Sequence, residues 1–511
     1  MAVDIGKKQI SKNLVFNIIA FVLQFAISFY ISPVIVSKVG KAAYGFIGIA
    51  NDFVSYAAII ASVFNSVASR FIANEYYHKN YEKADAYFSS LMTTNLVLSL
   101  LFSVVGLIVV VDAEKLLDIP AALVTDVKWT FALVFASYLV TLMTVVLTSS
   151  AYVANRTDVL GRREIIKQCL RFAFVLFFLN FVSVKLYWVS AAMLFATAIV
   201  ALMNIRIPKR FTPEITFRWK AAKVSYVKEL ALAGGWLAFT NISNLLMRGL
   251  DLTLANAMLG ANAMGLLSVA RTIPNNFTSA IGTIAPLFTP VFILCYVQKR
   301  NEELTERINK SVRTMALVLF VPISGFIVYS NDFYTLWQKG LTETDIALVT
   351  AISTITVVQA YFNATTATLA QISVVVNKLK FPVFVSLGCG VANILAVVIL
   401  LKTTDLGLLG IVIPGTVLFI IRYVFFNSFY AAKVLGERIW RFIGNEMITW
   451  AAIPLVVLEC VLVKKWVPVH SWGTMVLSAA LAGLIGYATV AVLLARKECL
   501  GFIAKMRGRK K

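Results

Sequence analysis

The sequence predicts an all-α fold, a polytopic integral membrane protein with about fourteen transmembrane helices. Two observations predict it. Hydrophobic residues make up 59% of the 511 residues and charged residues only 14%, which leaves too few polar side chains to cover the surface of a soluble protein of this length. Long apolar runs, each near the roughly 20 residues that cross a bilayer, follow one another with short connections. The composition excludes a soluble enzyme, a disordered chain and a disulfide-rich secreted domain.

The predicted spans follow these runs in chain order. The first run comes after three lysines and has no small-residue cleavage site behind it, so it is predicted to be a retained span. The eighth run contains Pro274, Pro286 and Pro290, and a kinked or broken helix is expected there because each proline removes a backbone hydrogen bond. The predicted spans are 14–37, 43–67, 87–111, 127–153, 164–183, 186–205, 231–257, 263–293, 312–330, 345–371, 381–401, 406–430, 443–463 and 473–495.

The cations are unevenly distributed among the connections. The chain has 47 Lys and Arg against 25 Asp and Glu, a formal net charge of +22. With a cytoplasmic N-terminus, 35 of the cations lie at or near the cytoplasmic face, nine lie in outer connections and three lie within spans. This bias predicts that both termini are cytoplasmic. The excess charge is therefore assigned to topology and to contact with membrane lipid, and no nucleic-acid partner is expected. The terminal part of this charge is the cluster Arg507, Arg509, Lys510 and Lys511.

An internal repeat at an offset of 220 residues predicts two related halves. A second pair, Asn155-Arg156 and Asn377-Lys378, follows the fourth span of each half. The predicted domains are a six-helix bundle at 1–210, a second six-helix bundle at 211–435, and two further helices with a basic cytoplasmic tail at 436–511. Transporters built from such halves hold their substrate between them and alternate access. The matched residues are Gly40, Ala43, Gly45 and Ala50 with Gly260, Ala263, Gly265 and Ala270.

Three arginines within predicted spans, Arg248, Arg271 and Arg422, are the first candidates for ligand contact. Each lies about eight residues, or roughly 12 Å, from the nearest span end, which snorkelling does not easily cover. Arginine at the bilayer centre costs about 2.5–3.5 kcal/mol on the insertion scale, so each needs a partner or a wet cavity. Because arginine binds phosphate with a planar fork, the three predict contacts to an anionic headgroup. Structural roles are the alternative: Asp251 could neutralise Arg248, and Arg422 could cap carbonyls or reach the interface.

Other polar residues extend this candidate site. Arg70, at the predicted inner end of the second span, is either a cytoplasmic anchor or part of an inward-facing entrance. The side chains of Asn241, Asn244 and Asn275 suit a hydroxyl-rich ligand, and they equally suit hydrogen bonds between helices.

Three intramembrane carboxylates are candidates for exchange of H⁺ or Na⁺ during transport: Asp52, Asp251 and Glu459. Pairing with arginine explains them equally well, and Glu459 could snorkel beside Lys464 and Lys465. No cofactor is expected. With two histidines and scattered cysteines the sequence predicts no metal site. No nucleotide-binding motif is present, and no connection is long enough for an ATPase domain.

The sequence resembles the multidrug/oligosaccharidyl-lipid/polysaccharide (MOP) exporter superfamily in length, number of spans and division into two six-span halves. Lys12-Asn13, the turns after Gly40 and Gly260, and Gly234-Gly235-Trp236 are similar to the polysaccharide transporter branch, and within it to Wzx-type O-antigen and capsule repeat-unit flippases. The resemblance implies a bacterial inner-membrane protein of lipopolysaccharide or capsule biosynthesis. Its substrate would be an undecaprenyl-diphosphate-linked oligosaccharide, carried from the cytoplasmic to the periplasmic leaflet. The polysaccharide assembly machinery would be its partner, and a monomer is expected because two halves are already covalently joined.

Two other functions remain as alternatives, and one further branch of the superfamily is disfavoured. The run Leu14 to Val36 has no charge, which argues against the lipid II flippase branch with its arginines early in the first helix. A multidrug or cation antiporter is disfavoured by three membrane arginines. A membrane polysaccharide polymerase or ligase usually needs a sizeable outer loop, whereas the largest outer connections, Asp112–Asp126 and Asn331–Thr344, have about fifteen residues each.

Overall fold

The computed structural model describes residues 7–494, so the predicted tail cluster Arg507 to Lys511 lies outside the described residues. Within the described range, thirteen helical segments are long and apolar enough to cross a membrane. A further apolar helix, Val22–Lys38, forms the second part of α1 (Lys7–Lys38). The prediction of an all-helical polytopic membrane protein with about fourteen spans is confirmed.

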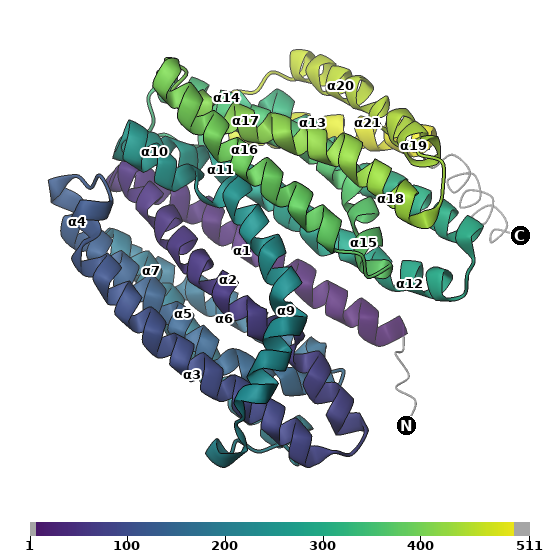
Figure 1. Cartoon of the computed structure of the whole chain (residues 1–511). Coiled ribbons are helices and arrows are strands. Elements are labelled where there is room, and N and C mark those ends of the chain that lie inside the picture. Colours follow the sequence, from purple (N-terminus) through teal and green to yellow (C-terminus); the bar gives the residue numbers. More distant parts are fainter. Residues whose placement is uncertain (1–6, 495–511) are drawn as a thin grey trace, which may run out of the picture. The chain divides into compact units, whose positions relative to one another are not determined.

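The chain divides into two compact units, Met1–Ser268 and Val269–Lys511, and the division falls inside α11 (Ala261–Ile284). In the first unit, α2 is the central helix and packs against α3, α5 and α9 (Figure 1). Besides α1, this unit contains α2 (Lys41–Tyr77), α3 (Tyr81–Val111), α4 (Ala113–Leu116), η1 (Ala121–Leu123), α5 (Val124–Val153), α6 (Thr157–Phe177), η2 (Phe178–Val182), α7 (Leu186–Asn204), α8 (Arg206–Phe211), η3 (Trp219–Ala221), α9 (Val224–Asn244), η4 (Leu245–Gly249) and α10 (Asp251–Leu259).

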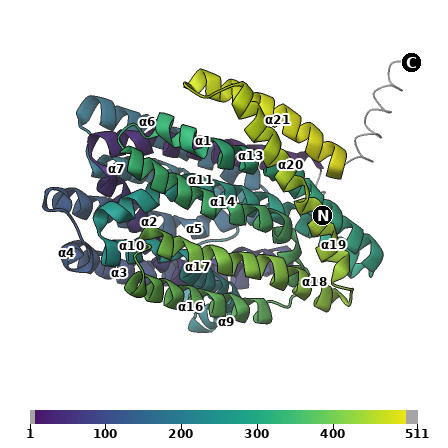
Figure 2. The same ribbon diagram turned by 90° about the horizontal axis from the view of Figure 1, so that it is seen from above.

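In the second unit, α13 packs along α14, and the last two long helices, α20 and α21, pair with each other and cover α13 (Figure 2). After α11 this unit contains η5 (Ala285–Phe288), α12 (Thr289–Val297), α13 (Asn301–Trp337), α14 (Glu343–Ala370), α15 (Ile372–Val375), α16 (Lys380–Thr403), α17 (Leu408–Ile421), η6 (Arg422–Asn427), α18 (Ser428–Leu435), α19 (Trp440–Trp450), α20 (Ala452–Trp466) and α21 (Trp472–Leu494).

The predicted spans coincide with helices, but several helices extend beyond them. α2 was predicted over 43–67 and continues to Tyr77, and α13 begins at Asn301 rather than near residue 312. The added turns are rich in charged and polar residues. Hydropathy identifies only the stretch that suits hydrocarbon, whereas the helical hydrogen bonds continue into the interface. Arg70 therefore lies two turns before the end of α2 and does not terminate it.

The broken eighth span is confirmed. α11 runs through Pro274, and the short 3₁₀ segment η5 then separates it from α12. Pro286 lies within η5, and Pro290 stands at the start of α12, where a missing N–H is tolerated.

The repeat predicted from the sequence is present in the backbone. α2 spans Lys41–Tyr77, and its counterpart, α11 to α12, spans Ala261–Val297, so both ends are displaced by 220 residues. Residues with positive φ recur at matching positions before and after these segments and after the fourth span of each half. Such residues are uncommon, so their recurrence supports a shared architecture. They are Gly40 and Gly260 (109° and 88°), Lys79 and Lys299 (59° and 57°), and Asn155 and Asn377 (51° and 55°).

The repeated glycines also contact each other, within the first unit. A Cβ atom added at Gly45 would lie 2.9 Å from the Cα atom of Gly265, and one added at Gly265 would lie 2.2 Å from the carbonyl oxygen of Lys41. Both distances are too short for any side chain, so this crossing of α2 with the first turns of α11 requires glycine at both positions.

The predicted domain boundaries at 210/211 and 435/436 stay a prediction.

Candidate functional site

Two of the three predicted intramembrane arginines lie in π-helical turns. Arg248 is in η4, between α9 and α10 of the first unit, and Arg422 begins η6, after α17 of the second unit. Both side chains are half-buried, and the Arg422 guanidinium carbon lies 6.0 Å from the centroid of the Tyr423 ring. A π turn is rare and is frequently found at functional sites, because it redirects side chains within an otherwise regular helix.

Tyr56 on α2 forms a hydrogen bond to the π turn that contains Arg248. Its hydroxyl donates a hydrogen bond to the Gly249 carbonyl oxygen over 2.6 Å, and it lies 3.2 Å from the hydroxyl of Thr253. A carbonyl inside a membrane cannot turn to water for a partner. The phenol therefore stabilises the non-standard backbone beside Arg248. Tyr56 was not among the residues predicted from the sequence. Its hydroxyl group within the apolar span 43–67 is the one feature that could have pointed to it.

α9 crosses α2 at the glycine pair that was singled out in the sequence. A Cβ atom at Gly234 would lie 1.8 Å from the carbonyl oxygen of Val63, whereas one at Gly235 would meet nothing within 4 Å. About two helical turns after Gly234, the side-chain amide of Asn241 donates a hydrogen bond to the Ser62 hydroxyl over 3.2 Å. Asn241 thus makes a hydrogen bond between helices, which was the second of the two roles expected from the sequence. Small and polar residues are common at such helix contacts in membranes.

Arg271 and Asn275 lie four residues apart on α11, so they share one face of the helix. Arg271 is half-buried and Asn275 is exposed, with the buried ring of Pro274 between them. Asn244, the last residue of α9, is exposed. Arg70 is exposed as well, and its guanidinium carbon lies 5.6 Å from the centroid of the Phe71 ring.

The predicted carboxylates occupy three different settings. Asp52 lies on α2 and is half-buried. Asp251 is the first residue of α10, where a negative charge is favoured by the helix dipole. The helix is interrupted between Arg248 and Asp251, because Leu250 has φ −101° and ψ −5°. Neutralisation of Arg248 by Asp251, the alternative given above, stays a prediction.

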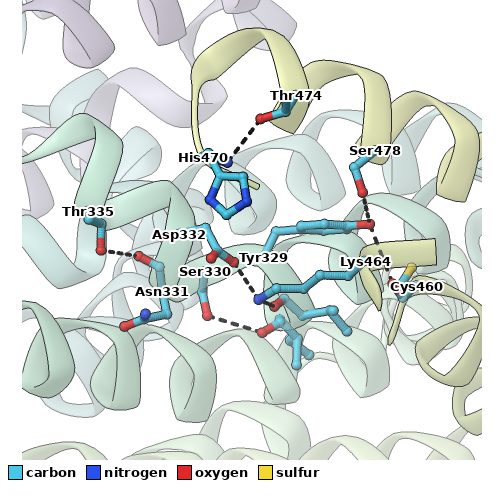
Figure 3. A network of polar contacts seen from close by, with 12 residues as sticks. Tyr329, Ser330, Asn331, Asp332, Thr335, Cys460, Lys464, His470, Thr474 and Ser478 are labelled. Carbon is cyan, nitrogen blue, oxygen red and sulfur yellow. Dashed lines mark hydrogen bonds and ion pairs between the residues drawn. The ribbon is translucent and has the colours of Figure 1, made fainter. Parts of the chain in front are cut away.

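Glu459 is held by a hydroxyl rather than by the lysines expected beside it. The Thr489 hydroxyl on α21 donates to Glu459 Oε1 over 2.5 Å. Lys464 instead forms an ion pair with Asp332 on α13 and donates to the Val328 carbonyl oxygen over 3.1 Å (Figure 3). Glu459 thus keeps a buried carboxylate oxygen, Oε2, with no hydrogen-bond partner among the described residues.

Residues 10–295, more than half of the chain, match the sequence model of a family described as "Polysaccharide biosynthesis protein". The chain belongs to this family. Its match to a named relative is much longer: it is 26% identical over 462 residues to "Uncharacterized membrane protein EpsK" of Bacillus subtilis (strain 168), covering 90% of each chain.

Solved structures show the fold of this family member. A multidrug resistance MATE-family transporter of the MOP superfamily, in an inward-facing conformation, has a TM-score of 0.70 at 12% identity and covers 82% of this chain and 94% of its own. The lipid II flippase MurJ, in an inward closed conformation, also has a TM-score of 0.70, at 13% identity, with 95% and 99% covered. The chain thus has the MOP-superfamily fold, as its resemblance implied.

Proposed function

We propose that this protein is a lipid-linked oligosaccharide flippase. It would move undecaprenyl-diphosphate-linked sugar repeat units of O-antigen or capsule type from the cytoplasmic to the periplasmic leaflet of the bacterial inner membrane, by alternating access. The family membership supports a role in polysaccharide biosynthesis, and the fold is one that transporters use.

The observation that carries the proposal is the placement of the arginines. Arg248 and Arg422 are half-buried within spans and stand on π turns, and Arg271 is half-buried on the helix that the prolines break. Guanidinium groups in a membrane are costly unless a ligand, a partner or water compensates them. A diphosphate or an acidic sugar supplies such compensation during its passage. Asn244 and Asn275 are exposed and are available to sugar hydroxyls.

An apolar cleft in the second unit suits the lipid part of such a substrate. It has a volume of about 300 Å³ and lies among α13, α20 and α21. Its walls are aromatic and small, including Phe326, Tyr329, Ala482 and Tyr487. A prenyl chain packs well against such a surface and needs no polar partner there.

The contacts of α2 with α11 support alternating access. The glycine crossing at Gly45 and Gly265 joins the first turns of both helices, which are the predicted periplasmic ends. Asp118, in the connection after α4, accepts a hydrogen bond from the Ala261 N–H over 3.1 Å and so caps α11 at the same end. Asp118 is also joined to Asn256 on α10 by two hydrogen bonds, so small residues and hydrogen bonds form the contact at this end.

We propose three further parts, each taken from the sequence. Both termini lie in the cytoplasm, and the protein acts as a monomer alongside the polysaccharide assembly machinery. Transport is coupled to H⁺ or Na⁺ through Asp52, Asp251 or Glu459. Glu459 is a candidate because one of its oxygens, Oε2, is buried without a described hydrogen-bond partner.

The experiment is a deletion strain in which the leaflet that holds the lipid-linked units is determined. Units trapped at the cytoplasmic face support a flippase. Units that reach the periplasm but stay unpolymerised contradict it and indicate a polymerase or ligase. Normal polysaccharide with lost drug resistance indicates a multidrug antiporter.

A further inference from the structure

A polar cavity lies within the first unit, and none of the three arginines discussed above lines it. It is a cleft of about 180 Å³ lined by α5, α6 and α7. α7 packs against both α5 and α6, which contact each other only sparsely, so α7 forms the floor of the cleft. Its polar lining includes Thr141, Thr144, Thr148, Arg163, Thr197 and Asn204.

The cleft leads from the predicted cytoplasmic end of the unit toward the membrane interior. Thr141 lies twelve residues before the end of α5, which is roughly 18 Å along the helix axis. Thr141, Thr144 and Thr148 are spaced by three and four residues and therefore share the face of α5 that lines the cleft. Thr141 is exposed and Arg163 is half-buried, so the cleft is open to the surface of the unit.

Arg163 is the uncompensated charge of this cleft. Its Nη1 donates to the side-chain oxygen of Asn204 over 2.7 Å, a neutral partner, and no carboxylate pairs with it among the described residues. The other charge acting on it is the cation Arg210. Arginine has five N–H donors, so most of those on Arg163 remain available to a ligand.

The other charges in the cleft neutralise each other. Lys167 pairs with Glu164 Oε2 over 2.5 Å, and the Gln168 amide donates to Glu164 Oε1 over 2.7 Å. The carboxylate therefore has partners on both oxygens and does not balance Arg163. The site keeps a net positive charge beside neutral hydroxyls, an arrangement that favours an anion.

Thr197 provides a second donor. It is 8% exposed, and its hydroxyl oxygen accepts a hydrogen bond from the Ser137 hydroxyl over 3.2 Å. Its own proton has no described acceptor, although the side chain is buried and lines the cleft. A buried donor of this kind usually has a partner, and an anion in the cleft would provide one.

We propose that the cleft among α5, α6 and α7 binds the phosphate group of a membrane lipid, with Arg163 as the main ligand and Thr197 as a second donor. Its volume is below the roughly 300–1,000 Å³ of sites for drug-sized molecules, so it holds the phosphate end of a lipid and not a whole oligosaccharide. The inference rests on the proposed function, because it gives the diphosphate of the same lipid-linked substrate a binding site in this cleft in addition to its contacts with the three arginines. The same phosphate chemistry is present in an anionic phospholipid, and the experiment separates these two sources.

The test uses the full chain in phosphatidylcholine nanodiscs, with dissociation constants for undecaprenyl diphosphate and for phosphatidylglycerol measured by native mass spectrometry. Arg163→Gln should weaken binding of at least one of the two lipids by about tenfold or more, because a charged hydrogen bond is lost. The matched control is Arg162→Gln, on the same helix and with the same charge change, since Arg162 is exposed and lies 3.9 Å from Asp158. The lipid affected identifies the source.

Equal binding of both lipids by wild type, Arg163→Gln and Arg162→Gln overturns the inference. If Arg163→Gln fails to fold, Arg163→Lys serves instead: it keeps the charge, loses the planar fork and should bind severalfold more weakly than wild type. Wild-type binding by Arg163→Lys together with Thr197→Val overturns the inference as well. A deletion strain without a flipping defect would defeat the proposed function alone, because the phosphatidylglycerol measurement does not depend on it.

Discussion

The hydroxyl of Tyr56 on α2 donates a hydrogen bond to the carbonyl oxygen of Gly249, with 2.6 Å between the two oxygens. Gly249 closes the π turn that contains Arg248. This bond joins the central helix of the first unit to the backbone that orients a candidate ligand arginine. A carbonyl that a π turn leaves without its regular helical partner needs another donor inside a membrane, and Tyr56 provides one for Gly249.

Tyr56→Phe should therefore lower both stability and transport. The substitution leaves the Gly249 carbonyl without this donor, at a cost of about 1–3 kcal/mol, and lets the π turn relax around Arg248. The measurements are the melting temperature of the purified protein and polysaccharide export at matched protein levels. Tyr152→Phe is the control, because Tyr152 is 54% exposed and makes no described side-chain hydrogen bond. Equal losses in both variants would show that Tyr56 has no special role.

Gly234→Ala should destabilise the protein far more than Gly235→Ala. The first substitution places a methyl group 1.8 Å from the Val63 carbonyl oxygen, and the second meets nothing within 4 Å. Overpacking of this kind typically costs about 1–3 kcal/mol. Thermal unfolding in one detergent compares the two directly, and similar melting temperatures would contradict the close crossing of α2 and α9.

The arginines are tested one at a time. Arg248→Gln, Arg271→Gln and Arg422→Gln should each reduce export, and at least one should do so by about tenfold, the loss expected for one charged hydrogen bond to a phosphate. Arg438→Gln is the control, since Arg438 is exposed and lies outside the helices between α18 and α19. Surface polysaccharide is measured at equal protein levels. If all three variants export at the wild-type rate, the arginine proposal fails.

Glu459→Gln tests ion coupling. The amide keeps the shape of the side chain and the contact with the Thr489 hydroxyl, but it cannot release a proton or attract Na⁺. If Glu459 couples transport, the variant should fold normally and lose the dependence of export on the ion gradient, which is measured with ionophores that abolish the H⁺ or the Na⁺ gradient separately. A gradient dependence identical to that of wild type would exclude Glu459, and the same test then applies to Asp52 and Asp251.

The order and approximate extents of the helices could be predicted because crossing a bilayer demands long apolar helices. The break after α11 could be predicted as well, because Pro286 and Pro290 each lack the backbone N–H that a regular helix needs. The repeat was visible in glycines because Gly40 and Gly260 both need positive φ. In each case one residue type has one dominant physical consequence.

The π turns at Arg248 and Arg422 could not be predicted in this way. No residue type requires a π turn, and such a turn depends on a tertiary partner, as Tyr56 shows. The packing of α9 on α2 within the first unit was also unforeseen, because sequence repeats indicate related halves and not which helix packs where. The cleft at Arg163 could not be predicted either, because the position of Arg163 is that of an ordinary cytoplasmic cation and the threonines of α5 fall within an apolar span.

The most direct test of the central claim is transbilayer movement in proteoliposomes. Purified protein is reconstituted with an undecaprenyl-diphosphate-linked oligosaccharide, and the fraction of the lipid-linked sugar that an external lectin reaches is followed with time. The proposed function predicts much faster movement than in protein-free liposomes, and a large loss of that rate when Arg248, Arg271 and Arg422 are all changed to Gln. Movement no faster than in protein-free liposomes, with correctly folded protein present, would contradict it.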